Sequence, residues 1–210
     1  MENIDRTLTA VIMIGGQSRR IGGGIKSLIH FNNKSIFDRI LERLIPQFKK
    51  IILNCNVDQE KFTNYDLPII EDIKKGYLGP LAGIHCSMKW IIENDPQTEW
   101  LITFPGDTPF IPSNFVSNLK KKISLKNKII LVQSDNKVHP IIGAWHKSLF
   151  NDLDQHLNNG TRKILTWANN YEIDFINYNT IPYDPFFNIN IENDLIEASK
   201  IEKNYINQNN

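Results

Sequence analysis

The stretch LTAVIMIGGQSRRIGGGIKS, residues 8–27, joins an apolar run to a glycine-rich loop. The run from Leu8 to Ile14 ends in Gly-Gly, which is typical of a buried strand that enters a loop. We therefore expect this segment to be the first strand of a parallel sheet.

Strand-like and helix-like segments alternate along the rest of the chain. Apolar runs predict further strands at 51–53, 67–70, 100–104, 129–132, 141–144 and 171–176. Amphipathic spacing and helix-starting prolines predict helices at 35–48, 81–92, 112–122, 149–157, 162–168 and 192–204. This order predicts a single-domain three-layer α/β/α sandwich with a Rossmann-like, mostly parallel sheet. Ligands of such sheets bind at the carboxyl ends of the strands.

The composition limits the class of protein. A chain of 210 residues with 41% hydrophobic and 22% charged residues suits one globular domain. A net charge of +1 argues against a nucleic-acid partner. No run approaches the roughly 18 apolar residues of a membrane span, and the acidic start lacks the basic region of a signal peptide. We expect a cytoplasmic protein without a membrane partner, in which Cys55 and Cys86 are reduced core thiols.

The glycine-rich loop is the strongest local signal. It holds five glycines, Arg19, Arg20 and Lys26 between Gly15 and Lys26. Glycines let backbone N–H groups approach phosphate oxygens, and the cations neutralise their charge, so the loop suits a nucleoside triphosphate. A P-loop is excluded because Ile25 precedes the lysine, and the dinucleotide fingerprint does not fit the spacing. The alternative is a surface loop without a ligand.

Two carboxylates follow predicted strands. Asp107 lies in FPGDTPFIP, residues 104–112, where prolines fix the backbone around it and where it could hold Mg²⁺. Asp72 follows the 67–70 strand and precedes GPLAGI, residues 79–84, whose small residues would let helix N–H groups approach a ligand. The alternatives are a turn that caps the next helix at Asp107 and tight helix-to-sheet packing at 79–84.

These segments together resemble the molybdenum cofactor guanylyltransferases over nearly the whole chain. The resemblance rests on the strand and glycine loop, LNCN (53–56), IEDIKKGYLGPLAGI (70–84), PGDTPFIP (105–112), HPIIGAWH (139–146) and FNINIENDL (187–195). It implies a nucleotidyltransferase type of fold, with a nucleotide-binding half at about 1–110, a pterin-substrate half at about 111–204 and a frayed tail at 205–210.

The resemblance also implies the roles of individual residues. The GTP side comprises Met13, Ile14, Gly15 and Gly16 at the guanosine and phosphates, Lys26 at the triphosphate, Asn54 and Asp72 at the guanine nucleoside, and Asp107 at the magnesium ion. The molybdopterin side comprises His139, Pro140, Asn188 and Asn190. The chain departs from the family at Ile25, where an aspartate is usual, and at Met13 and Ile14, where Leu-Ala is usual.

The implied reaction transfers GMP from GTP to molybdenum-molybdopterin with release of pyrophosphate. Its catalytic residues would be Lys26, Asp107 and Arg19 or Arg20, with Mg²⁺ as the cofactor. Handover of the product to molybdoenzymes or chaperone proteins is a further expectation. The alternatives are a cytidylyltransferase or sugar-phosphate nucleotidyltransferase, and a noncatalytic nucleotide-binding protein.

Overall fold

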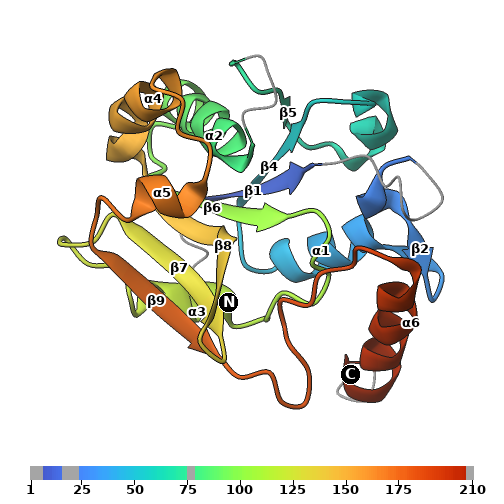
Figure 1. Ribbon diagram of the computed structural model, residues 1–210. Helices are drawn as coiled ribbons and strands as arrows, with labels where there is room; N and C mark the ends of the chain where they lie inside the picture. Colours follow the sequence, from blue (N-terminus) through green and yellow to red (C-terminus); the bar gives the residue numbers. More distant parts are fainter. Residues whose placement is uncertain (1–6, 16–23, 75–78, 207–210) are drawn as a thin grey trace.

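A seven-stranded sheet crosses the centre of the molecule in the order β5-β4-β1-β6-β8-β7-β9 (Figure 1). The computed structural model describes residues 7–15, 24–74 and 79–206. The strands are β1 (Leu8–Ile14), β4 (Lys50–Cys55), β5 (Ile69–Ile70), β6 (Trp100–Pro105), β7 (Ile129–Ser134), β8 (Lys137–His146) and β9 (Ile173–Tyr178). All pair in parallel except β8, which is antiparallel to β6 and β7. The predicted mostly parallel α/β sheet is confirmed.

Helices cover both faces of the sheet (Figure 1). They are α1 (Ile36–Leu44), α2 (Pro80–Asn94), α3 (Phe115–Lys120), α4 (Phe150–Asn158), α5 (Ile164–Ala168) and α6 (Glu192–Ile201). One apolar cluster joins the sheet to α1, α3 and α6, and a second joins it to α2, α4 and α5. No described helix combines the length and the apolar character that crossing a membrane would require.

Strand β1 is buried on both faces. Ala10 and Ile12 pack into the first cluster, whereas Val11 and Met13 pack into the second. Because successive side chains of a strand point to opposite faces, only a continuous apolar run can satisfy both layers. The run that predicted β1 therefore reflects its central position.

Helix α1 begins at a capping box. Ser35 Oγ accepts a hydrogen bond of 3.0 Å from the Asp38 amide, and Asp38 Oδ2 accepts one of 3.1 Å from the Ser35 amide. These reciprocal bonds satisfy amides that the first helical turn leaves without partners. The start predicted at residue 35 is thereby explained.

Some predicted boundaries are wrong. The helix predicted from Pro112 begins at Phe115, because the Pro112 carbonyl closes a turn with the Phe115 amide at 3.1 Å. The hairpin of β2 (His30–Phe31) and β3 (Lys34–Ser35) and the 3₁₀ helix η2 (Gln59–Tyr65) were not predicted.

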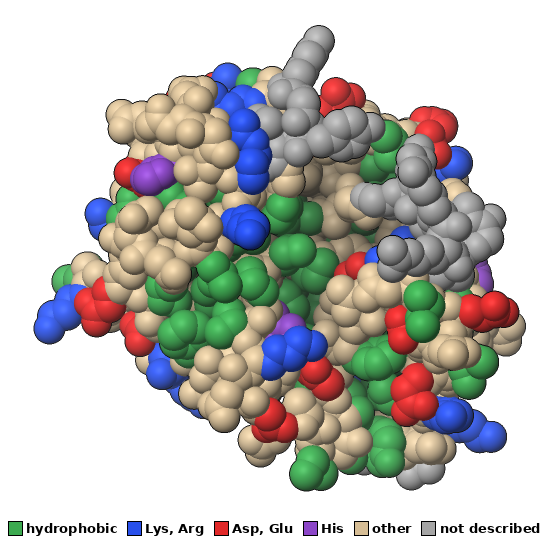
Figure 2. All heavy atoms as spheres, viewed as in Figure 1, with side chains coloured by type: hydrophobic (Ala, Val, Ile, Leu, Met, Phe, Trp, Pro, Cys, Tyr) green, Lys and Arg blue, Asp and Glu red, His purple; other side chains and the backbone are tan. Residues whose placement is uncertain are grey.

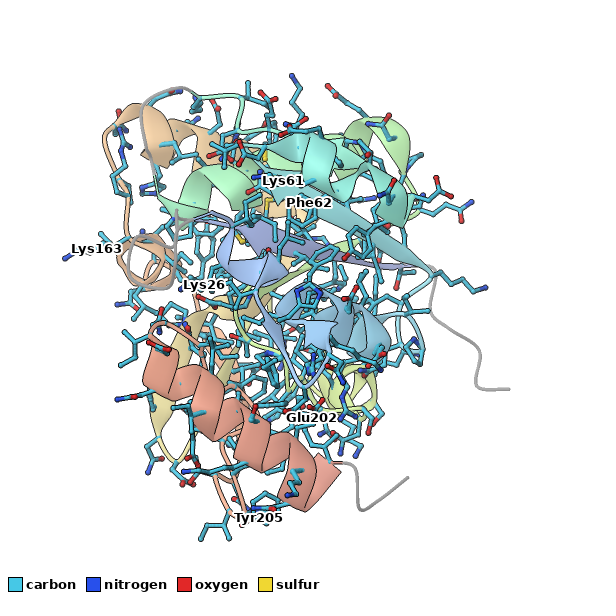
Figure 3. All side chains as sticks on the ribbon, turned by 90° about the vertical axis from the view of Figure 1, so that its right-hand side faces the viewer. Lys26, Lys61, Phe62, Lys163, Glu202 and Tyr205 are labelled. Carbon is cyan, nitrogen blue, oxygen red and sulfur yellow. The ribbon has the colours of Figure 1, made fainter. Side chains whose placement is uncertain are left out.

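The predicted frayed tail also begins too early. The π-helical segment η4 (Glu202–Ile206) continues α6, and Tyr205 stacks on Tyr183 with ring centroids 5.8 Å apart. Residues 207–210 lie outside the described part of the chain. Figure 3 shows Glu202 and Tyr205 along this C-terminal helical segment.

Candidate functional site

A cavity of about 640 Å³ opens at the carboxyl ends of β1, β4, β5 and β6. Its volume falls within the range of small-molecule and cofactor sites. The face of the molecule in Figure 2 is hollowed near its centre, where apolar side chains gather. The described residues that line the cavity are Met13, Ile14, Gly15, Lys26, Ser27, Asn54, Asn56, Val57, Asp72, Gly79, Pro80, Gly83, Pro105, Gly106, Asp107, Ile141 and Asn188.

One end of the cavity carries a lysine with two acceptors. Lys26 begins the short 3₁₀ helix η1 (Lys26–Leu28), and its Nζ lies 2.8 Å from Asp107 Oδ2. The same Nζ donates to Asn190 Oδ1 at 2.7 Å. The Lys26 and Asp107 side chains are 17% and 19% exposed, so a ligand can still reach them. Lys26 therefore connects the loop after β6 to the segment before α6.

The other end carries an amide and a carboxylate. Asn54, at the end of β4, is buried, and its Nδ2 donates to Asp72 Oδ1 at 3.1 Å. The amide of Asp72 donates to Asn56 Oδ1 at 2.7 Å. These bonds hold the Asp72 carboxylate at the edge of β5, where it can accept hydrogen bonds from N–H groups of a ligand.

Helix α2 approaches this end closely because it carries a glycine. A Cβ atom on Gly83 would lie 2.5 Å from Asn54 Oδ1 and 2.5 Å from Met13 Cε, which is closer than real contacts. The helix begins at Pro80 without a side-chain cap, and Gly79 before it has φ of 71°. The Ala82 amide of this first turn donates to the Gly79 carbonyl at 3.1 Å, and Gly79, Pro80 and Gly83 line the cavity.

The loop after β6 also depends on a glycine. A Cβ atom on Gly106 would lie 2.7 Å from Ile14 Cδ1 and 3.3 Å from the Met13 carbonyl. The Gly106 amide donates to that carbonyl at 3.0 Å. This close contact with β1 fixes the backbone from which Asp107 projects.

Ile25, where the resemblance leads us to expect an aspartate, is not among the described residues that line the cavity. Its side chain is 7% exposed and belongs to the apolar cluster that contains α1. It precedes η1 without capping it through a side-chain hydrogen bond. The substitution therefore places a core side chain before Lys26, and Lys26 still reaches Asp107.

The residues predicted for the pterin side divide into two groups. Asn188 lines the cavity, and Asn190 contacts Lys26. His139 instead shares a 2.6 Å hydrogen bond with Ser134 Oγ and packs against Phe186. Burial lowers the pKa of His139 below its ordinary value. His139 and Pro140 lie on β8 before Ile141, which does line the cavity.

The structure thus brings together most of the predicted nucleotide residues. Met13, Ile14, Gly15, Lys26, Asn54, Asp72 and Asp107 all line one cavity. Gly16, Arg19 and Arg20 lie outside the described residues. Cys55 and Cys86 are buried free thiols, as predicted, and burial raises the pKa of each.

Sequence reasoning missed Ser27, Gly106 and Ile141 as cavity residues. Gly106 lies in the PGD segment that drew attention to its neighbour, so the segment itself was a signal. A serine after a lysine and an isoleucine in a strand carry no such signal.

Comparison with known proteins identifies the family of the chain. Residues 10–172 match the MobA-like NTP transferase domain. The chain belongs to this family. A molybdenum cofactor guanylyltransferase from Rhodopseudomonas palustris (strain BisB5) is 35% identical over 194 residues, which cover 91% of this chain and 92% of the relative.

Solved structures share the fold of this MobA-like NTP transferase. The molybdopterin-guanine dinucleotide biosynthesis protein A from Archaeoglobus fulgidus has a TM-score of 0.74 and 23% identity, covering 93% of this chain and 98% of that one. The 4-diphosphocytidyl-2C-methyl-D-erythritol synthase from Anaerococcus prevotii has a TM-score of 0.65 and 15% identity, covering 95% and 98%. The same fold therefore occurs in a protein named for a cytidyl product.

Proposed function

We propose that this chain transfers GMP from GTP to molybdenum-molybdopterin and releases pyrophosphate. The observation that carries the proposal is a single cavity with Lys26 and Asp107 at one end and Asn54 and Asp72 at the other. The first pair suits a metal-bound triphosphate, and the second suits a base. The curated relative's name, molybdenum cofactor guanylyltransferase, supports the choice of both substrates.

Asp107 is our proposed magnesium ligand. Nucleotidyltransferases of this family generally use a divalent metal ion. Over the described ranges, no three His, Cys, Asp or Glu side chains form a group that could hold a metal. A site with Asp107 as its one protein carboxylate still suits Mg²⁺, because this ion takes one or two carboxylates together with phosphate oxygens and waters. Asp107 would hold the ion, which would supply positive charge to offset the negative charge that develops on the phosphate oxygens.

Lys26 is proposed to serve the leaving group. The terminal phosphate of molybdopterin attacks the α-phosphorus of GTP, the bond to the bridging oxygen breaks, and pyrophosphate leaves with the electron pair. Lys26 leaves its ion pair with Asp107, contacts the phosphates and stabilises the negative charge of the leaving pyrophosphate. We assign the same role to Arg19 or Arg20. The attacking phosphate is largely ionised near neutral pH, so the step needs no general base.

Asp72 is proposed to read the base. The Watson–Crick edge of guanine offers two adjacent N–H donors, which a carboxylate can accept together. Asn54 holds Asp72 in place at 3.1 Å, and the first turn of α2 flanks the same end of the cavity. Met13, Ile14, Gly15 and Gly16 would contact the guanosine and phosphates. A cytosine edge offers one amino donor beside acceptors, which suits a carboxylate less well.

The acceptor is proposed to bind beside β8. Asn188 lines the cavity there, and His139 and Pro140 lie on the adjoining part of β8. This divides the molecule into a nucleotide half at about 1–110 and a pterin half at about 111–204. We further propose a cytoplasmic location and handover of the product to molybdoenzymes or chaperones.

A turnover assay tests the function. The purified chain is given molybdenum-molybdopterin, Mg²⁺ and each of the four nucleoside triphosphates in turn, and pyrophosphate release is measured. We expect GTP to be the preferred substrate. Preference for CTP would favour the cytidylyltransferase alternative, and tight GTP binding without pyrophosphate release would favour a noncatalytic nucleotide-binding protein.

A further inference from the structure

A buried hydroxyl group in the cavity lacks a hydrogen-bond partner. Ser27 is 2% exposed and lines the cavity. Its Oγ has no hydrogen-bond partner within the part of the chain that the structure describes. Buried hydroxyls are normally paired, because an unpaired one loses its bonds to water without replacement. The missing partner of Ser27 is therefore to be sought in a ligand of the cavity.

Ser27 lies at the end of the cavity that carries Lys26 and Asp107. It follows Lys26 in η1, and Lys26 is the one cation among the described lining residues. On its other side is Gly106, where an added Cβ would lie 3.5 Å from Ser27 Cβ. Gly106 precedes Asp107 directly. The amide and carboxylate that suit a base belong instead to β4 and the end of β5.

We propose that Ser27 is a phosphate-binding residue, whose Oγ donates a hydrogen bond to a non-bridging phosphate oxygen of the bound nucleoside triphosphate. The inference rests on the proposed function, since it takes the nucleotide to be the occupant of the cavity. A phosphate oxygen accepts only, so the hydroxyl supplies the donor that the anion needs. Lys26 beside it supplies the positive charge.

Because Ser27 Oγ has no partner among the described residues, Ser27→Ala should have opposite effects on the stability of the apo protein and on its affinity for the nucleotide. Without ligand, the substitution removes an unpaired buried hydroxyl and leaves the rest of the site in place, so the apo protein keeps or raises its Tm. With ligand, it removes a donor to an anion. A serine that serves only the fold would show the opposite pattern.

Ser87 is the matched control. It is also buried, and its Oγ donates to the Gly83 carbonyl at 2.6 Å. It does not appear among the described lining residues. Ser87→Ala therefore removes a satisfied hydroxyl from the same molecule, and we expect it to lower the apo Tm without changing nucleotide affinity.

The experiment is calorimetric titration of wild type, Ser27→Ala and Ser87→Ala with GTP and with guanosine, in Mg²⁺ and without molybdopterin, alongside apo melting curves. We expect Ser27→Ala to weaken GTP binding about tenfold, the effect of one charge-assisted hydrogen bond, and to leave guanosine binding unchanged.

Three results would overturn the inference. One is unchanged GTP affinity in Ser27→Ala while wild type binds GTP. Another is an equal loss of GTP and guanosine affinity, which would place Ser27 at the nucleoside. The third is a fall in apo Tm like that of Ser87→Ala. If wild type prefers CTP, the proposed base is wrong, but the same comparison with CTP still tests Ser27, because the two nucleotides share the triphosphate.

Discussion

The ammonium group of Lys26 lies 2.8 Å from Oδ2 of Asp107, although the two residues are 81 positions apart in the sequence. The contact joins the end of the glycine loop to the loop after β6. A positive and a negative group held together in this way neutralise each other until a ligand of mixed charge separates them. A magnesium–triphosphate complex has that character, with a cation for Asp107 and an anion for Lys26.

Each partner of this pair should be needed for turnover. We expect Lys26→Ala and Asp107→Ala each to lower kcat by about 100- to 1000-fold, which is typical of losing one preorganised charge. Both side chains are partly exposed, so the fold should persist, as circular dichroism can verify. Lys89→Ala, which removes an exposed lysine 3.7 Å from Glu93, is the control. Near-normal turnover in Asp107→Ala would contradict the magnesium assignment.

Asn190 should affect the nucleotide as well as the pterin. Its Oδ1 accepts a hydrogen bond from Lys26 Nζ at 2.7 Å, and its backbone N–H donates to Asp194 Oδ2 at 2.6 Å. We expect Asn190→Ala to weaken GTP binding roughly threefold to tenfold without molybdopterin, because Lys26 loses an orienting acceptor worth about 1 kcal/mol.

Asn188→Ala provides the comparison for Asn190→Ala. Asn188 lines the cavity two residues earlier, and we expect its loss to alter the KM for molybdopterin rather than the GTP affinity. Titration with GTP and steady-state kinetics with varied molybdopterin distinguish the two roles. If Asn190→Ala changes only the KM for molybdopterin, the contact with Lys26 has no functional part.

The predictable part of the fold is the part whose burial shows in the sequence. Strand β1 is apolar on both faces because layers cover both sides of it. The direction of β8 was not predictable, because it depends on pairing between β6 and residues about 40 positions later, such as Thr103 with Gly143. The β2–β3 hairpin has two residues in each strand, which is too short for a periodic pattern.

The site shows a similar division. Lys26 and Asp107 were predictable singly, because each lies in a segment with unusual glycine or proline content. Their contact depends on tertiary packing that places η1 against the loop after β6. Ser27 was not predictable, since its significance comes from burial without a partner, which only the folded molecule displays.

Gly83 should be intolerant of a side chain. The Cβ of Gly83→Ala would lie 2.5 Å from Asn54 Oδ1 and Met13 Cε, so both side chains must move. Overpacking of this kind costs about 1–3 kcal/mol, which exceeds the gain of about 1 kcal/mol that alanine brings to a helix. We expect a lower free energy of unfolding and weaker GTP binding, measured by urea denaturation and titration. A more stable variant with normal affinity would show that the site can relax.

Glu202 should stabilise the protein in a pH-dependent way. It forms a bidentate ion pair with Arg39, with Nε–Oε1 and Nη2–Oε2 distances of 2.8 Å, and the Arg39 and Glu202 side chains are 5% and 11% exposed. Burial alone would raise the pKa of Glu202, but hydrogen bonds from Arg39 and Asn32 outweigh it and hold the pKa below its ordinary value. The folded pKa is lower than the unfolded one, so the stabilisation is present above about pH 4.5 and is lost as the pH falls towards the folded pKa.

We expect Glu202→Ala to cost about 3–5 kcal/mol at pH 7, because Arg39 is left buried without its counter-charge. Urea denaturation should show that the cost of Glu202→Ala in free energy of unfolding is smaller at pH 4 than at pH 7. The control is Glu197→Ala, which removes an exposed carboxylate 3.3 Å from Lys200 and should cost about 0–1 kcal/mol at both pH values. Equal costs for the two variants would mean that the buried pair does not stabilise the C-terminal helix.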